Sequence, residues 1–254
     1  MYYTTRGLVL REATYKESDK ILTLLTADLG LLTVKARGVK RKNSPLRGGC
    51  QLLTYSEFTL FERKGFYTVN EAEPLRLFDG LRQDIELLSL GSYFAQVLET
   101  VSAAEQSDPE VLNLGLNCLY ALESLNIPQR LVKAVFELRL LCLIGFAPRL
   151  EGCGWCGEES AAWFLPRDGI LLCQVCRGAS SGEPGISLSP GALAVMRHIT
   201  GCDKKKLFSF TLTEPAQREL GEVTERFLLT QLGQTFPALE FYKRLFPQED
   251  RGAL

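Results

Sequence analysis

Two Cys-x-x-Cys pairs place the strongest single constraint on how this chain folds. Cys153 and Cys156 form the first pair, Cys173 and Cys176 form the second, and sixteen residues lie between the pairs. Each such turn directs two thiolates to one side of a metal ion, and two turns at this spacing complete the tetrahedral shell of a zinc ribbon. The segment between them resembles a β-hairpin with its turn at 167–169. The sequence therefore predicts one structural zinc ion.

Three other uses of these cysteines compete with structural zinc. A thioredoxin-like redox pair needs a βαβ setting, which the surrounding sequence lacks. A zinc deaminase needs an upstream His-x-Glu, whereas the one histidine, His198, lies downstream and is expected on a helix face. An iron–sulfur cluster stays open as an alternative, because four thiolates also suit it. Four thiolates leave no open coordination position, so we expect the cluster to hold the fold together and not to catalyse.

The compartment expected for this chain favours a metal over disulfides. The N-terminal stretch MYYTTRGLVLREATYKESDK lacks the apolar core of a signal peptide, and no run of about 18 uncharged apolar residues appears. We therefore expect a cytoplasmic protein without a membrane span, whose cysteines stay reduced. The remaining cysteines are interpreted as small apolar residues: Cys50, Cys118, Cys142 and Cys202.

The first 75 residues have the pattern of short strands. Segments rich in Val, Leu, Thr, Tyr and Phe, bounded by Gly, Asp, Ser and Lys/Arg clusters, occur at 6–15, 20–27, 30–39, 50–63 and 65–73. Five strands at this spacing, with one longer basic loop between the third and fourth, predict a small closed β-barrel.

After Pro74 the apolar residues recur at helical intervals. Helices are expected over 77–103, over 108–126 with an Asp108 N-cap, and from Pro128 onward. Two later helices are expected to begin at Ser189-Pro190 and at Thr213-Glu214-Pro215, with a loop and a short extended piece over 203–212 between them.

The expected architecture is therefore α+β, in five parts. These are a barrel over 1–76, a helical domain over 77–150, a zinc-ribbon insertion over 151–180, C-terminal helices packing on the helical domain over 181–246, and a frayed tail over 247–254.

Positive charge is concentrated near the N-terminus, although the formal net charge is only −1. Residues 1–80 hold 13 of the 29 Lys/Arg residues but 9 of the 30 Asp/Glu residues, and 35–49 carries six cations and no acidic residue. A solvated loop is the simpler interpretation of a basic run, but beside a small barrel this one suits nucleic-acid phosphates. The candidate DNA-binding residues are Lys35, Arg37, Lys40, Arg41, Lys42 and Arg47, with Arg6, Arg11 and Lys16 extending the patch if their strand lies beside it.

Aromatic residues of the predicted barrel are candidates for stacking on bases. They are Tyr15, Tyr55, Phe61, Phe66 and Tyr67, and we expect half or more of them to be buried in the core instead. No G-x-S-x-G, Walker loop, H-E-x-x-H or G-x-G-x-x-G motif appears, so nothing nominates a catalytic site and the chain is predicted not to be an enzyme.

Several motifs in a fixed order resemble the RecO family of bacterial recombination mediator and DNA repair proteins. They are G-L-V-L, Y-x-E-x-D-x-I-L-x-L-L-T and G-L-L-x-V-x-A-R-G-V-K-R within 6–46, then G-F-x-P-x-L before a C-G-x-C-G knuckle, a second C-x-x-C, and P-x-L-x-x-Y-K-R-L-F near the C-terminus. The resemblance extends through the whole chain.

The resemblance implies an OB-fold barrel, a helical remainder, and a zinc element in members that keep the cysteines. It also implies binding to single- and double-stranded DNA, annealing of complementary strands, and, with RecR and single-stranded DNA-binding protein, loading of the RecA recombinase at the nucleoid. The family offers no active-site chemistry to carry over.

The helical half is expected to bind partners. An acidic, apolar tail of a single-stranded DNA-binding protein would need a pocket rimmed by cations, for which Arg130, Lys133 and Arg139 are weak candidates beside ordinary surface charge. Two other functions stay open: an RNA-binding OB-fold protein, and a zinc-stabilised protein-interaction adaptor that binds no nucleic acid.

Overall fold

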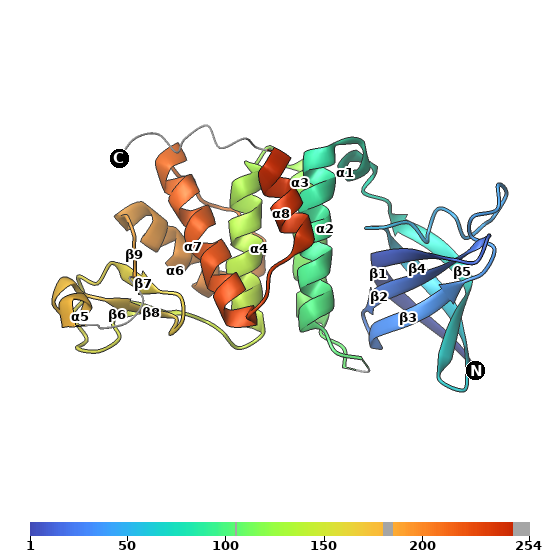
Figure 1. Cartoon of the computed structure of the whole chain (residues 1–254), viewed down its shortest axis with the longest axis horizontal. Coiled ribbons are helices and arrows are strands. Elements are labelled where there is room, and N and C mark those ends of the chain that lie inside the picture. Colours follow the sequence, from blue (N-terminus) through green and yellow to red (C-terminus); the bar gives the residue numbers. More distant parts are fainter. Residues whose placement is uncertain (105, 180–184, 246–254) are drawn as a thin grey trace. The chain divides into compact units, whose positions relative to one another are not determined.

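The chain divides into two compact units, and Figure 1 labels the helices and strands that form them. The structure, a computed structural model, describes residues 1–104, 106–179 and 185–245, so the tail expected over 247–254 lies outside the described residues. Unit 1 is Met1–Leu125 together with the segment from Phe236, and unit 2 is Asn126–Thr235. Within the described residues, no helix is both long and apolar enough to cross a membrane.

Unit 1 begins with the closed five-stranded barrel that the sequence predicts. Its strands are β1 (Tyr2–Tyr15), β2 (Asp19–Thr26), β3 (Gly30–Ala36), β4 (Tyr55–Arg63) and β5 (Phe66–Arg76), in the order β1-β2-β3-β5-β4. Only β3 and β5 pair in parallel, at Val34 with Tyr67 and Lys35 with Thr68. Alternate side chains from all five strands fill the barrel, among them the fully buried Phe58.

Strand β1 is longer than the sequence indicates, because its two halves pair with different strands. Its first half pairs with β4, with Tyr2 opposite Phe61, and its second half pairs with β2, with Tyr15 opposite Asp19. The register shifts between Val9 and Arg11. Such an irregularity bends a strand, which lets one strand close the barrel.

Four helices complete the described part of unit 1. They are α1 (Asp79–Gln83), α2 (Ile85–Val101), α3 (Pro109–Ser124) and α8 (Pro237–Leu245). The helix expected over 77–103 is divided, because the Asp84 carboxylate accepts hydrogen bonds from the N–H groups of Glu86 and Leu87 and starts α2. The Asp108 N-cap of α3 is confirmed. Helix α8 packs on α2, where Gln96 accepts a hydrogen bond from the N–H of Ala238.

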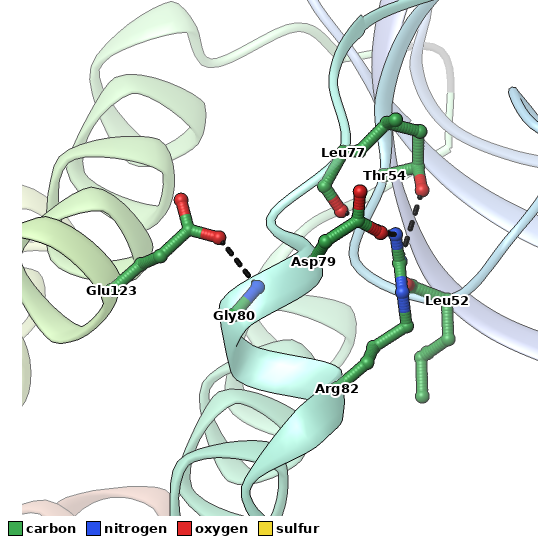
Figure 2. Close-up of polar contacts among 7 residues, drawn as sticks. All are labelled: Leu52, Thr54, Leu77, Asp79, Gly80, Arg82 and Glu123. Carbon is green, nitrogen blue, oxygen red and sulfur yellow. Dashed lines mark hydrogen bonds and ion pairs between the residues drawn. The ribbon is translucent and has the colours of Figure 1, made fainter.

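Arg82 joins the barrel to these helices. Figure 2 shows its guanidinium between residues 52–54, which precede β4, and the segment that leaves β5. Nη1 donates to the Leu52 carbonyl at 2.7 Å and to Thr54 Oγ1 at 3.2 Å, and Nη2 donates to the Leu77 carbonyl at 2.6 Å and to Asp79 at 2.8 Å. One planar side chain thus satisfies oxygens from two separate segments.

Unit 2 contains three long helices and a small sheet. The helices are α4 (Gln129–Leu143), α6 (Pro190–Gly201) and α7 (Glu214–Leu232). The sheet has the order β6-β8-β7-β9, formed by β6 (Arg149–Cys153), β7 (Trp163–Leu165), β8 (Ile170–Leu172) and β9 (Ile186–Ser187), with α5 (Gln174–Ala179) after β8. The predicted hairpin is β7–β8, with its turn at Gly169. The prediction of a short extended piece within 203–212 is wrong, because the structure has a 3₁₀ turn at Lys204–Lys206 and irregular backbone there.

The unit boundary falls inside the segment 77–150 that the sequence pattern groups into one helical domain. The reason is the choice of packing partner. Helix α4 packs mainly on α7 and α6, whereas α3 packs on α2 and α1. An apolar stripe shows that a helix has a buried face, but not which helix covers it.

A buried charge cluster joins α4 to α7. Lys133 Nζ lies 2.9 Å from Glu137 and 2.9 Å from Glu225, and Thr224 Oγ1 donates to Glu137 at 2.8 Å. Burial alone would lower the pKa of Lys133, but attraction to the two carboxylates outweighs burial and raises that pKa, so the ammonium stays charged. Lys133 is therefore an interior residue, and its prediction as a cation at the rim of a partner-binding pocket is wrong.

We expect Lys133→Met to lower the free energy of unfolding of unit 2 by about 3–5 kcal/mol, because the fully buried Glu137 and the half-buried Glu225 lose their shared cation. Both tryptophans, Trp155 and Trp163, lie in unit 2, so tryptophan fluorescence during urea denaturation measures the change. The control is Arg130→Met, an exposed position on the same helix, for which a loss below about 0.5 kcal/mol is expected. Equal losses in the two variants would contradict the account of the cluster.

Candidate metal centre and nucleic-acid interface

The four predicted metal ligands meet at one end of the small sheet. Cys153 ends β6, Cys156 lies in the turn after it, Cys173 follows β8 and Cys176 lies in α5. The first turn is closed by the Gly157 N–H, which donates to the Cys153 carbonyl at 2.9 Å. The sheet therefore brings the two knuckles together from positions twenty residues apart.

The geometry of the thiols fits a tetrahedral ion. All four Sγ atoms lie within 4.8 Å of one another, and those of Cys156 and Cys173 are 3.7 Å apart. Four thiolates about 2.3 Å from one zinc ion lie about 3.8 Å apart, so the sulfur atoms need little movement. The N–H of Cys176 donates to Cys173 Sγ at 3.4 Å, as expected for a knuckle that stabilises thiolates. The cluster can hold a metal ion, and the donor set suits zinc or iron.

Hydrogen bonds from the backbone favour ionisation of one of the four thiols in this cluster. Burial opposes ionisation of Cys153, but hydrogen bonds from the backbone at Cys173, Cys156 and Trp155 outweigh it and lower the pKa of Cys153 to about 6. Hydrogen bonding to the neighbouring Cys156 thiol, with burial, raises the pKa of Cys176 to about 12. Four thiols this close do not all ionise without a cation, so metal binding must release protons.

Eight of the nine candidate DNA-binding cations fall into two groups, and the ninth, Lys16, is exposed with its Nζ 5.6 Å from the centre of the Tyr15 ring. Three have carboxylate partners: Arg6 pairs with Glu57 at 3.1 Å, Arg11 with Glu99 at 3.0 Å, and Lys35 with Asp19 at 3.1 Å. The other five are exposed, and no ion pair to another described residue is found for them: Arg37, Lys40, Arg41, Lys42 and Arg47. These five, which we call the open cations, all lie on the β3–β4 connection, residues 37–54.

The β3–β4 connection is fixed at both ends. At its start, Asp19 accepts a hydrogen bond from the Gly38 N–H at 2.8 Å; this bond and Lys35 hold the pKa of Asp19 below its usual value. Lys35 Nζ also lies 4.6 Å from the centre of the Tyr15 ring. At its end, the buried Leu53 packs near Gly91 of α2, where an added Cβ would lie 2.8 Å from the leucine side chain. The open cations are therefore displayed on an anchored segment.

A pocket of about 570 Å³ lies between this connection and the barrel wall. It is lined by Tyr2, Arg37, Gly38, Arg41, Asn43, Ser44, Pro45, Leu46, Phe61, Thr68, Val69 and Asn70. Two of the open cations belong to this lining, and none of the lining residues is acidic.

The aromatic candidates are more exposed than the sequence indicates. None of the five is buried: Tyr15, Phe61 and Phe66 are exposed, and Tyr55 and Tyr67 are half-buried, so the expectation that half or more are buried is wrong. Leu and Val side chains and Phe58 dominate the interior of the small barrel, Tyr67 packs half-buried against this core, and the rings of Tyr15, Phe61 and Phe66 are exposed. Phe61 lines the pocket together with Tyr2, which the sequence pattern missed because β1 starts earlier than indicated.

The other two candidate rim residues have different surroundings. Arg139 Nη1 donates to the carbonyls of Ile199 and Thr200 at 3.2 and 3.1 Å, so it caps the C-terminal end of α6. Arg130 is exposed, and its side chain lies close to Gly221 of α7.

Cys153→Ser is expected to abolish most metal binding and to lower the melting temperature, because three ligands no longer close the shell. Inductively coupled plasma mass spectrometry measures the number of metal ions bound per folded chain, and it also distinguishes zinc from iron. Cys202→Ser, at a half-buried cysteine of the same unit outside the cluster, should keep the wild-type metal content. A Cys153→Ser protein that loses its metal at an unchanged melting temperature would show that the ion is not structural.

Comparison with known proteins covers nearly the whole chain. Residues 1–78 match the family model described as Recombination protein O N terminal, and residues 82–240 match Recombination protein O C terminal. The first match covers the barrel and the residues that directly follow β5, and the second covers the helices and the cysteine-containing segment.

Full-length relatives agree with the two domain matches. The DNA repair protein RecO of Acetivibrio thermocellus is 33% identical over 246 residues, which are 96% of this chain and 97% of that protein. That of Alkaliphilus metalliredigens is 30% identical over 248 residues, 96% of this chain and 100% of that protein. That of Heliobacterium modesticaldum is 37% identical over 81% of this chain and 76% of that protein. With its OB-type barrel, helical remainder and four-cysteine cluster, the chain belongs to the RecO family of DNA repair proteins.

Proposed function

We propose that this chain binds single- and double-stranded DNA through the open cations and anneals complementary strands. The observation that carries the proposal is their common position: five exposed cations without an ion pair to another described residue lie on one anchored connection. Membership of a DNA repair family supports DNA as the polyanion.

Binding by this surface is electrostatic. Each lysine or arginine that contacts a phosphate releases a condensed counterion, so the affinity falls steeply with salt and depends little on sequence. The three paired cations contribute less, because Glu57, Glu99 and Asp19 already neutralise them. Of these, Lys35 serves chiefly to hold the start of the connection, since Asp19 also binds the Gly38 N–H.

Annealing follows from the same charges. Two strands repel each other, and a basic surface reduces this repulsion by replacing diffuse counterions with fixed ammonium and guanidinium groups. Strands held close together then pair, and base pairing supplies the net free energy. The reaction makes and breaks no covalent bond, so the proposed activity needs no catalytic residue and no nucleotide hydrolysis.

Within repair, we propose that the chain works with RecR to help load RecA onto strands coated by single-stranded DNA-binding protein. This places it in the bacterial cytoplasm, at the nucleoid. We propose zinc as the ion of the cysteine cluster, where Cys153, Cys156, Cys173 and Cys176 would hold it. Its contribution is stability of the small sheet, because four thiolates leave no site for a substrate.

The first test replaces three open cations outside the pocket: Lys40→Glu, Lys42→Glu and Arg47→Glu together. We expect the affinity for a labelled single strand to fall more than about 10-fold at low salt. We also expect the slope of log affinity against log salt to become shallower by about 2, since each lost phosphate contact on a single strand removes about 0.7. Fluorescence anisotropy across a salt series measures both quantities.

A control with the same charge change lies in the other unit. Lys204, Lys205 and Lys206 are exposed, and replacing all three by Glu changes the net charge equally. This control should bind within about two-fold of the wild type. Equal losses of affinity in both triple variants would mean that binding depends on net charge and not on the β3–β4 connection. Absence of binding by the wild-type chain would favour the adaptor function.

A second test measures annealing directly. The wild-type chain should accelerate pairing of two complementary labelled strands in the absence of any nucleotide, and the Lys40/Lys42/Arg47→Glu variant should lose most of that acceleration. Energy transfer between dyes on the two strands gives the rate. A requirement for added nucleotide would contradict the mechanism.

A further inference from the structure

We propose that the pocket between the β3–β4 connection and the barrel holds one unpaired base of single-stranded DNA. This inference rests on the proposed function, and it assigns a second, base-dependent contribution to a binding surface that otherwise recognises only phosphates. It predicts that this surface binds single strands, which annealing consumes, more tightly than duplex.

The floor of the pocket offers an aromatic surface. Tyr2 and Phe61 lie opposite each other on β1 and β4, and their ring centroids are 5.1 Å apart with planes inclined at 51°. Tyr2 is 62% exposed and Phe61 is 37% exposed, so both rings are accessible from solvent. The chain on either side is held, because Met1 exchanges backbone hydrogen bonds with Glu62. A base that stacks on these rings meets a surface already in place.

The edge of the pocket next to the connection offers positive charge. Arg37 and Arg41 lie on either side of Gly38, which has φ +64° and whose carbonyl accepts a hydrogen bond from the Arg41 N–H at 3.1 Å. This turn brings both guanidinium-bearing residues into the lining of the pocket. Phosphates that flank a base on the aromatic floor would therefore meet two open cations.

The remaining polar lining does not select one base. Asn43 and Asn70 are exposed amides, each with donors and an acceptor, and Ser44 and Thr68 carry hydroxyl groups that can do either. Groups of this kind can satisfy the edges of any of the four bases after rotation of the side chain. Such tolerance suits a protein that must anneal strands of any sequence.

An unpaired base fits this pocket better than a duplex does. In a duplex, both faces of each base are covered by its neighbours and its pairing edge is occupied, so stacking on Phe61 requires the base to leave the helix at a cost of a few kcal/mol. A base in a single strand meets no such cost. The pocket should therefore strengthen binding of single strands and leave duplex binding, which depends on the open cations, nearly unchanged.

The test compares a short single strand with an equally long strand of stable abasic residues, which keeps every phosphate and removes every base. We expect the wild-type chain to bind the normal strand about 10-fold tighter, and Phe61→Ala to lose most of this preference with unchanged affinity for the abasic strand and for duplex. Phe241→Ala, at an exposed phenylalanine of α8 outside the pocket, should keep the preference.

The outcomes separate this inference from the proposed function. Salt-sensitive binding of both strands with equal affinity would overturn the base pocket and leave the open cations as the DNA site. A preference that survives in Phe61→Ala would also overturn it, since the stacking surface would then lie elsewhere. Failure of the wild-type chain to bind any strand would overturn the proposed function itself.

Discussion

The hydrogen bonds of Arg82 fix the end of the segment on which the proposed DNA surface lies. Its two terminal nitrogens donate to the carbonyls of Leu52, which precedes β4, and Leu77, which follows β5, where the two antiparallel strands meet. Between the anchored residues, Leu53 is fully buried at φ 62°, a conformation that a leucine adopts only when its surroundings hold it there. Because this end is fixed, the open cations project from a defined part of the barrel and not from a free loop.

Pairing of charges, more than their number, decides how this protein uses its basic residues. Acidic partners neutralise Arg6, Arg11 and Lys35, which then act within the fold, and Lys133 serves the interior of unit 2 in the same way. The open cations lack such partners among the described residues, so their counterions are available for exchange with phosphates. A chain with a formal net charge of −1 can in this way present a strongly basic surface.

The two chemical features of the chain have different roles and belong to different units. The cysteine cluster lies in unit 2, and its four sulfur atoms are close enough to one another to share one metal ion beside the small sheet. The pocket and the open cations lie in unit 1. The proposed metal site and the proposed DNA-binding surface therefore consist of separate residues, so one can be altered while the other is measured.

The sequence by itself determined the barrel, the N-cap of α3, the ligand set and the basic connection, because each depends on local spacing: alternation, a capping aspartate, Cys-x-x-Cys turns and a run without acidic residues. Only the tertiary structure decided which of these residues are available. Arg11 and Glu99 are far apart in the chain and pair in the fold, Lys133 becomes interior when α7 covers α4, and Tyr2 joins Phe61 only because β1 pairs with β4. Spacing along a chain fixes local geometry, whereas ion pairs, burial and pockets arise from contacts between distant segments, which no local pattern encodes.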